Sequence, residues 1–162
     1  MTATVRAAQP RDAAAVAGVY VASWNDGFAG LLPPRIVTPE TVRRWRDQLA
    51  AGPPAYWWVA ELEGNLAGVA GIGPSRDPAD PGLGELDTIA VLPSRWRMGV
   101  GRSLLAVAVR QLALCGYRQA ILWTLRDLPG SRRSYEAMGW GTDGGVRDEG
   151  RQVRYRRSLR PA

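Results

Sequence analysis

The chain has 162 residues, enough for one ordinary domain with a sizeable core, and its hydrophobic fraction of 46% is normal for a globular protein. Its net charge is +6, and because lysine and histidine are absent, all 21 basic residues are arginines. The missing histidine excludes histidine-based catalytic triads and histidine-ligated metal sites, and the missing lysine excludes a Walker-type phosphate loop. The arginines are spread along the chain, so charge alone does not favour a nucleic-acid binder.

The first third of the chain predicts a strand and two helices. Residues 4–8 have the pattern of a short strand, and the alanine- and valine-rich residues 11–24 that of a helix. The loop GFAGLLPP follows. Residues 38–40, a threonine, a proline and a glutamate, then start a second helix with a hydroxyl cap, a proline at the first position and an acid at the positive end of the dipole. We expect this helix to end at Gly52.

The middle of the chain predicts a β-hairpin and a further strand. Residues 55–62 and 66–73 form two apolar strands around a Gly-Asn turn at 64–65. The proline- and aspartate-rich residues 74–82 indicate a loop before the next strand, residues 84–93.

The last third predicts two helices and two strands. Apolar residues at helical spacing between 104 and 112 indicate a helix that Gly116 closes. A buried strand at 119–125, a short helix at 131–138 and an alternating strand at 151–159 complete the order. No repeat or linker interrupts it, which indicates a single mixed α/β domain.

Location and membrane contact follow from simple features of the sequence. The longest nearly apolar run, residues 13–24, is too short to cross a bilayer. No secretory signal pattern opens the chain, and the single cysteine, Cys115, allows no internal disulfide. We therefore expect a cytoplasmic protein without a membrane segment. Cys115 lies near the end of a predicted helix, where we expect it to be buried filler and not a nucleophile.

The segment PSRWRMGVGRSLL places two glycines and three arginines between a predicted strand and a helix. In that arrangement backbone N–H groups and the helix dipole converge on a phosphate, and Gly99 and Gly101 let the backbone approach it closely. Leu104 stands where the dinucleotide fingerprint needs a third glycine, and Arg102 where a Walker loop needs lysine. On its own, the glycine pattern favours a tight turn into a helix with solvated arginines.

The surrounding segments decide between these interpretations. IAV, five residues, then RMGVGR followed by SLL resembles the acetyl-CoA pyrophosphate loop of the GCN5-related N-acetyltransferase (GNAT) family. SWNDGFAGLLP, GELDTIAV, GYRQAILWTL and SRRSYEAMGW resemble further segments of that family in the expected order. The resemblance implies one α/β domain over residues 1–162, with a strongly bent, mostly antiparallel sheet of six to seven strands and about four helices.

The resemblance also implies acetyl-CoA as co-substrate, without a metal. The residues that match the family's coenzyme contacts are Ile89, Ala90, Val91, Arg97, Met98, Gly99, Val100, Gly101, Arg102 and Ser103. Two positions depart from the family pattern. Trp96 stands where glutamine or arginine usually opens the loop, and Leu128 replaces an asparagine seven residues before Tyr135. The first change weakens a side-chain contact to the diphosphate and the second removes a polar contact near the coenzyme arm, but the amide donors of the loop survive both.

The implied chemistry needs a base and an acid. An amine with a pKa of about 10 is neutral in only about one molecule in a thousand at pH 7, so a positioned base is useful. Glu85 matches the family's catalytic glutamate, and strand alternation puts Asp87 on the same face as a competing candidate. Tyr135 matches the family's general-acid tyrosine that protonates the leaving thiolate; as a plain residue it fits a core aromatic. A backbone N–H within residues 89–91 would bind the thioester carbonyl.

The leading hypothesis is an acetyl-CoA-dependent N-acetyltransferase that moves an acetyl group to a primary amine of a small molecule or peptide by direct attack in a ternary complex. The alternative is a catalytically weak acyl-CoA-binding sensor or partner protein of the same fold. A nucleic-acid binder, suggested by RQVRYRRSLR, ranks last, because Arg154, Arg156 and Leu159 of one strand cannot share a face. The resemblance also allows a homodimer.

Overall fold

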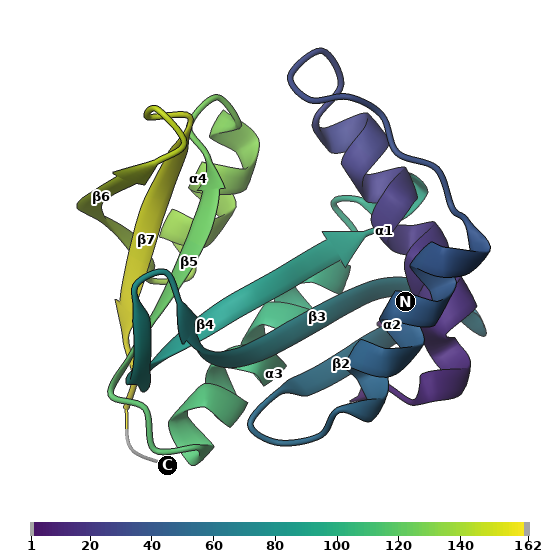
Figure 1. Ribbon diagram of the computed structural model, residues 1–162, viewed down its shortest axis with the longest axis horizontal. Helices are drawn as coiled ribbons and strands as arrows, with labels where there is room; N and C mark the ends of the chain where they lie inside the picture. Colours follow the sequence, from purple (N-terminus) through teal and green to yellow (C-terminus); the bar gives the residue numbers. More distant parts are fainter. Residues whose placement is uncertain (1, 161–162) are drawn as a thin grey trace. The chain divides into compact units, whose positions relative to one another are not determined.

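The computed structural model of the chain describes residues 2–160, which form seven strands and four α-helices (Figure 1). The helices are α1 (Ala13–Gly27), α2 (Pro39–Ala50), α3 (Val100–Leu114) and α4 (Pro129–Ala137). The strands are β1 (Thr4–Ala7), β2 (Tyr56–Leu62), β3 (Asn65–Arg76), β4 (Ala79–Val91), β5 (Gln119–Leu125), β6 (Gly141–Arg147) and β7 (Gln152–Ser158). Short 3-10 turns precede α1 and α3. Among these helices none is both long and apolar enough to span a bilayer.

The strands form one sheet in the order β1-β2-β3-β4-β5-β7-β6. The pairs β1–β2, β2–β3, β5–β7 and β6–β7 run antiparallel, whereas β4 and β5 run parallel, with Glu85 opposite Ile121. The mixed α/β class and the mostly antiparallel sheet expected from the sequence are confirmed.

The chain forms two compact units. One contains the described residues up to Ile72 together with Thr88–Ala108, and the other contains Gly73–Asp87 and the described residues from Val109 onward. Strands β3 and β4 and helix α3 contribute residues to both. The expectation of a single domain over the whole chain stays a prediction.

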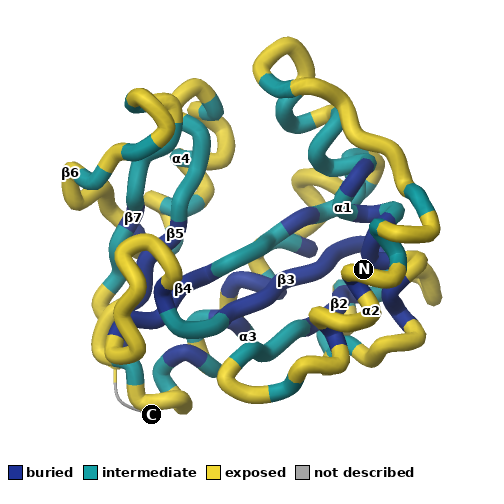
Figure 2. The backbone as a smooth tube through the Cα atoms, in the orientation of Figure 1, coloured by how far each residue is buried: buried dark blue, intermediate teal, exposed yellow. Residues whose placement is uncertain are grey.

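The core of the first unit lies where α1 and α2 meet the apolar residues of β2 and β3. Helix α2 starts as expected: the Thr38 hydroxyl accepts a bond from the Thr41 N–H (3.1 Å), and Pro39 takes the first helical position. Trp45 of α2 packs edge-on against Trp57 of β2, with ring centroids 5.3 Å apart. Figure 2 shows the buried residues running along β3, while the loop after α1 is exposed. The buried cluster comprises Ala13, Val16, Ala17, Val19, Trp45, Leu49, Val59, Val69 and Ala90.

Gly68 of β3 is closely surrounded by its neighbours in this unit. A Cβ there would lie 2.8 Å from Leu104 Cδ1 and 3.1 Å from both the Ala90 carbonyl oxygen and Val100 Cγ1. Because the backbone oxygen cannot give way, we expect Gly68→Ala to lower the free energy of unfolding by about 1–3 kcal/mol. Gly18 in α1 has open space and an ordinary φ, so Gly18→Ala is expected to raise that free energy by about 0.5–1 kcal/mol. Urea unfolding followed by circular dichroism measures both. Equal stability of the two variants would contradict the prediction.

In the second unit, a buried tyrosine links α4 to β7 by hydrogen bonds. Tyr155 of β7 is fully buried; its hydroxyl accepts a bond from Arg132 Nε (2.9 Å) and donates to Glu136 Oε2 (2.9 Å). Both partners lie on α4, so this phenol fixes the helix that carries Tyr135 to the strand beneath it. Because the hydroxyl both accepts and donates a hydrogen bond within the protein, burying it costs little free energy.

The structure corrects four local expectations. The hairpin turn is Glu63–Gly64, both with positive φ, because Leu62 pairs with Asn65; the predicted turn at 64–65 is off by one residue. Residues 74–82 are not a loop, since β3 continues to Arg76 and β4 begins at Ala79. Strand β6 was not predicted. Cys115 is exposed and not buried, because it follows α3 on a turn beyond the packed face of the helix.

Candidate active site

The glycine-rich turn between β4 and α3 belongs to the first unit and contains a row of open amides, meaning backbone N–H groups without an acceptor among the described residues. Arg97 and Gly99 both have positive φ (62° and 84°), and α3 begins at Val100, which is 1% exposed and anchors the turn. The Ser103 N–H donates to the Gly99 carbonyl at 3.0 Å. The N–H groups that precede it donate to no other group of the described residues: Met98, Gly99, Val100, Gly101 and Arg102.

Space and charge at this turn suit an anion. A Cβ on Gly101 would meet only Val91 Cγ2, at 3.6 Å, so the protein itself does not need glycine there. Arg97 and Arg102 are exposed and carry no carboxylate partner within residues 2–160. Arg95, by contrast, bonds to Glu63 Oε2 (3.3 Å) and is engaged. First-turn amides, the helix dipole and free guanidinium groups together favour a phosphate.

Trp96, the departure from the family pattern, binds the protein itself. Its indole Nε1 donates to the Val91 carbonyl oxygen at 2.8 Å, and the side chain remains 44% exposed. The bond ties the turn to the last residue of β4. Trp96 therefore shapes the turn from within, and its single N–H is not free to bind a ligand.

Glu85 and Asp87 meet on one arginine in the second unit. Glu85 is 4% exposed; its Oε1 accepts from the Arg76 backbone N–H (3.0 Å) and its Oε2 from Arg76 Nη2 (3.2 Å). The same Nη2 donates to Asp87 Oδ1, and Asp87 is more open to solvent. The guanidinium offsets the charge of the buried carboxylate. Each Glu85 oxygen accepts one bond and retains capacity for another, such as one from a water molecule.

Arg76 is the residue that sequence reasoning missed. It lies at the end of β3, nine residues before Glu85, inside the segment that was expected to be a loop. The segment PSRDPADPG is rich in proline and aspartate and does not indicate that the two strands continue. The strand pairing that brings Arg76 to Glu85 could therefore not be predicted from the local sequence. Strand alternation did place Glu85 and Asp87 on one face, and their shared partner agrees with that expectation.

Tyr135 lies on α4, with its ring tilted against that of Tyr155 at a centroid distance of 6.2 Å. The side chain is partly buried, and burial raises the pKa of the phenol to about 12. The hydroxyl makes no hydrogen bond to another described residue. Leu128 occupies the N-cap of the same helix without a side-chain cap, so the asparagine expected there is replaced by a residue that cannot bond.

Similarity to known proteins agrees with this geometry. The profile of the acetyltransferase (GNAT) family matches residues 17–140. The phosphinothricin N-acetyltransferase of Streptomyces viridochromogenes is 30% identical over 115 residues, which cover 69% of this chain and 62% of that protein. The mycothiol acetyltransferase of Streptomyces avermitilis is 29% identical over 141 residues, or 86% of this chain and 43% of that protein. The matches thus span less than two thirds of these curated relatives.

A solved structure shares the fold. The PaiA N-acetyltransferase of Thermoplasma acidophilum, crystallised in complex with coenzyme A, superposes with a TM-score of 0.77 at 16% identity, covering 98% of this chain and all of that one.

Proposed function

Because the chain belongs to the GNAT acetyltransferase family, we propose that it is an acetyl-CoA-dependent N-acetyltransferase. The acceptor is a primary amine of a small molecule or peptide, which attacks the thioester directly in a ternary complex. The observation that carries the proposal is the row of five open amides in the glycine-rich turn, Met98 to Arg102. We also propose a cytoplasmic location, which suits a chain with one cysteine. A homodimer stays a prediction.

Coenzyme binding would rest on the backbone. The open amides hold the diphosphate, with Arg97 and Arg102 adding charge and Ser103 closing the first turn of α3. The end of β4, Ile89 to Val91, supplies a backbone donor for the thioester carbonyl as charge develops on its oxygen. The Val91 carbonyl oxygen already accepts the Trp96 indole N–H. The coenzyme arm would therefore bond to the backbone N–H groups at this end of β4.

Glu85 is the proposed base. It is fixed by two bonds from Arg76, and through a water molecule it would accept a proton from the acceptor ammonium. Arg76 orients the carboxylate, and it bonds Asp87 at the same time. Asp87 is the competing base, since its carboxylate is the more open of the two.

Tyr135 is the proposed donor to the leaving thiolate. With its pKa raised to about 12, its phenol is fully protonated at any working pH. A thiol has a pKa of about 8.5, so complete proton transfer would be uphill by roughly 3.5 units, or about 5 kcal/mol. We therefore assign Tyr135 a hydrogen bond to the departing sulfur, with solvent completing the protonation.

Tyr135→Phe is expected to lower kcat by roughly 10- to 100-fold, because about 1.5–3 kcal/mol is typical of a hydrogen bond to a charged group.

The same variant also tests the raised pKa of the Tyr135 phenol. The unfolded phenol ionises near pH 10 and the folded one near 12, so wild-type stability falls as pH rises from 10 to 12, by roughly 2–3 kcal/mol. Urea unfolding of the wild type and the variant at pH 8, 10 and 11 checks this, because the difference between the two separates Tyr135 from the other four tyrosines and Cys115. A wild-type rate would remove Tyr135 from the mechanism, and an unchanged pH dependence would refute its burial.

The test of the function is release of free coenzyme A thiol from acetyl-CoA in the presence of amines. The panel includes phosphinothricin, the acceptor named for a relative, together with α-amino acids, a polyamine and a short peptide, and mass spectrometry identifies the acetylated product. Trp96 and Leu128 favour one other candidate, an acyl-CoA sensor. Tight acetyl-CoA binding without turnover of any amine would support the sensor and overturn the enzyme.

A further inference from the structure

The C-terminal arginines of the second unit divide into paired and unpaired groups. In RQVRYRRSLR, Arg151 pairs with Asp148, while Arg154 and Arg156 both bond to Asp143 of β6, at 2.7 and 2.9 Å. Arg157 and Arg160 have no carboxylate partner among residues 2–160. Two carboxylates of this unit, Asp143 and Asp148, therefore pair with three arginines of the segment, and two arginines have no acidic partner among the described residues.

The two unpaired arginines line the same hollow, of about 850 Å³. One wall is apolar and consists of Val109, Ala113 and Leu114 on the second half of α3. The volume lies within the range of small-molecule sites, about 300–1,000 Å³. No aspartate or glutamate is among the residues that line it.

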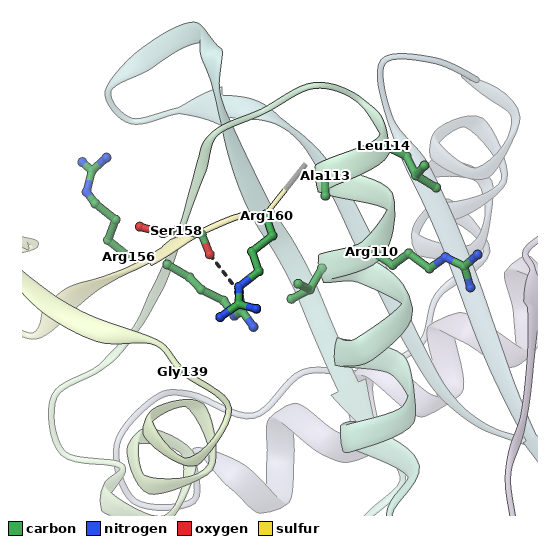
Figure 3. A pocket seen from close by; sticks show the side chains of 9 residues that line it. Arg110, Ala113, Leu114, Gly139, Arg156, Ser158 and Arg160 are labelled. Atoms are coloured by element: carbon green, nitrogen blue, oxygen red, sulfur yellow. Dashed lines mark hydrogen bonds between the residues drawn. The ribbon is translucent and has the colours of Figure 1, made fainter. Parts of the chain in front are cut away.

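Arg157 is held ready to donate. Its Nε donates to the Met138 carbonyl (3.1 Å) and its Nη1 to the Ser158 carbonyl (2.8 Å), so two of its five N–H groups are used and three remain. Figure 3 shows Arg160 reaching into the hollow, whereas Arg110 and Arg156 point away from its centre. The cationic part of the site is thus Arg157, fixed by backbone carbonyls, and Arg160, which is exposed and free to close on a ligand.

We propose that this hollow binds the phosphate monoester of a small organic molecule. A phosphate monoester carries a charge of about −1.5 to −2 near neutral pH, which matches two guanidinium groups, and it accepts the paired N–H donors that arginine presents. The ester's organic part lies against Val109, Ala113 and Leu114. An extended nucleic acid fits less well, because Asp143 occupies the arginines that would continue the row along β7. The proposal is independent of acetyl transfer.

Isothermal titration of the full chain with phenyl phosphate tests the site, with phenol and inorganic phosphate as separate arms. We expect phenyl phosphate to bind more tightly than either, and more weakly as salt increases. Arg160→Gln is expected to weaken binding roughly tenfold, the loss of one charged hydrogen bond. Arg133→Gln is the matched control, since Arg133 is exposed on α4, has no partner among the described residues and does not line the hollow. Arg157→Gln provides a second variant, with its fold checked by circular dichroism.

Further arms identify the source of the phosphate. Coenzyme A is itself a phosphate monoester; if Arg160→Gln weakens coenzyme A but not 3′-dephospho-coenzyme A, the coenzyme supplies the group. If Arg160→Gln weakens neither, the site is assigned to a separate phosphate monoester, whereas equal weakening of both would place another part of the coenzyme in the hollow and overturn the proposal. The proposal fails if phenyl phosphate does not bind, if Arg160→Gln and Arg133→Gln weaken it equally, or if a DNA duplex alone binds with a steep salt dependence.

Discussion

Glu85→Gln is expected to lower kcat by roughly 10²- to 10⁴-fold, the range typical of a lost general base, while the affinity for acetyl-CoA stays within about twofold. The amide keeps the size of the side chain and an oxygen to accept the Arg76 N–H, but it cannot take a proton from the acceptor. Stopped-flow thiol release with a good amine substrate, together with equilibrium titration of acetyl-CoA, separates the two quantities.

The buried position of Glu85 demands a control for structure. In the glutamine variant an NH₂ group can face the Arg76 guanidinium, which costs up to about 1–3 kcal/mol of stability. A loss of turnover caused by local rearrangement would therefore lower the unfolding free energy and the coenzyme affinity together. Asp87→Asn is the matched variant, because it removes the other carboxylate on the same arginine. If Asp87→Asn alone abolishes turnover, Asp87 is the base; if neither variant loses turnover, the base is neither of them.

Bulk at Gly101 is expected to block the coenzyme without harming the protein. A Cβ there has only an ordinary contact, with Val91 Cγ2 at 3.6 Å, and the φ of Gly101 is ordinary, so neither strain nor overlap opposes Gly101→Ala. Gly101→Val adds two γ carbons, and its stability is measured alongside its affinity. If the diphosphate lies on the open amides, each added carbon pushes it away. Losing one or two charged hydrogen bonds corresponds to a rise of roughly 10- to 100-fold in the Kd for acetyl-CoA, larger for valine than for alanine.

A control variant separates an effect on coenzyme binding from an effect on protein stability. Gly18→Val places the same side chain at a helical glycine with open space, in α1, and serves as the control for helix propensity. Calorimetric titration gives Kd, and thermal unfolding gives stability. An unchanged Kd for Gly101→Val would show that the diphosphate does not approach this turn, and the loop would then be only a helix start.

Local signals predicted those parts of the fold that depend on neighbours in sequence. The Thr38 cap and Pro39 set the start of α2, and residues 119–125 form β5 with the predicted bounds. Gly139, with a φ of 91°, ends the α4 turn as a glycine at that position should. The two helix ends are each marked by one or two residues with a specific steric or hydrogen-bonding role, and β5 by a continuous apolar run of neighbouring residues.

Features set by distant partners were not predictable in this way. Strand β6 has the polar, glycine-rich sequence GTDGGVR, and it pairs antiparallel with β7, whose Arg154 and Arg156 also donate to Asp143. The hairpin turn shifted by one residue because pairing of Leu62 with Asn65 fixed the register. Tertiary pairing overrode the weak strand propensity of β6 and the loop-like composition of residues 74–82.

The candidate site also combines features that the local sequence predicts with features that depend on residues distant in the chain. Glycine spacing predicted the turn, and the structure adds that its five amides are open. Strand alternation predicted that Glu85 and Asp87 share a face. Arg76, which donates to both, lies at the end of β3 and belongs to no sequence motif that would have identified it. From the sequence, Trp96 indicated only that the glutamine or arginine usual at this position of the loop is absent. The bond from its indole N–H to the Val91 carbonyl depends on the shape of the turn, which spacing does not give.

The exposure of Cys115 has a practical consequence for experiments on the proposed reaction with a thioester. Without lysine, the chain offers a thioester no side-chain amine, and its guanidinium groups stay protonated and unreactive. Its single thiol lies just beyond α3, with Gln111 Nε2 3.6 Å from the sulfur. A thiol-directed fluorophore will therefore attach at one defined position without any engineered substitution. That position follows the last residue of α3, whereas the open amides lie at its first turn, so a label on Cys115 does not occupy the glycine-rich turn.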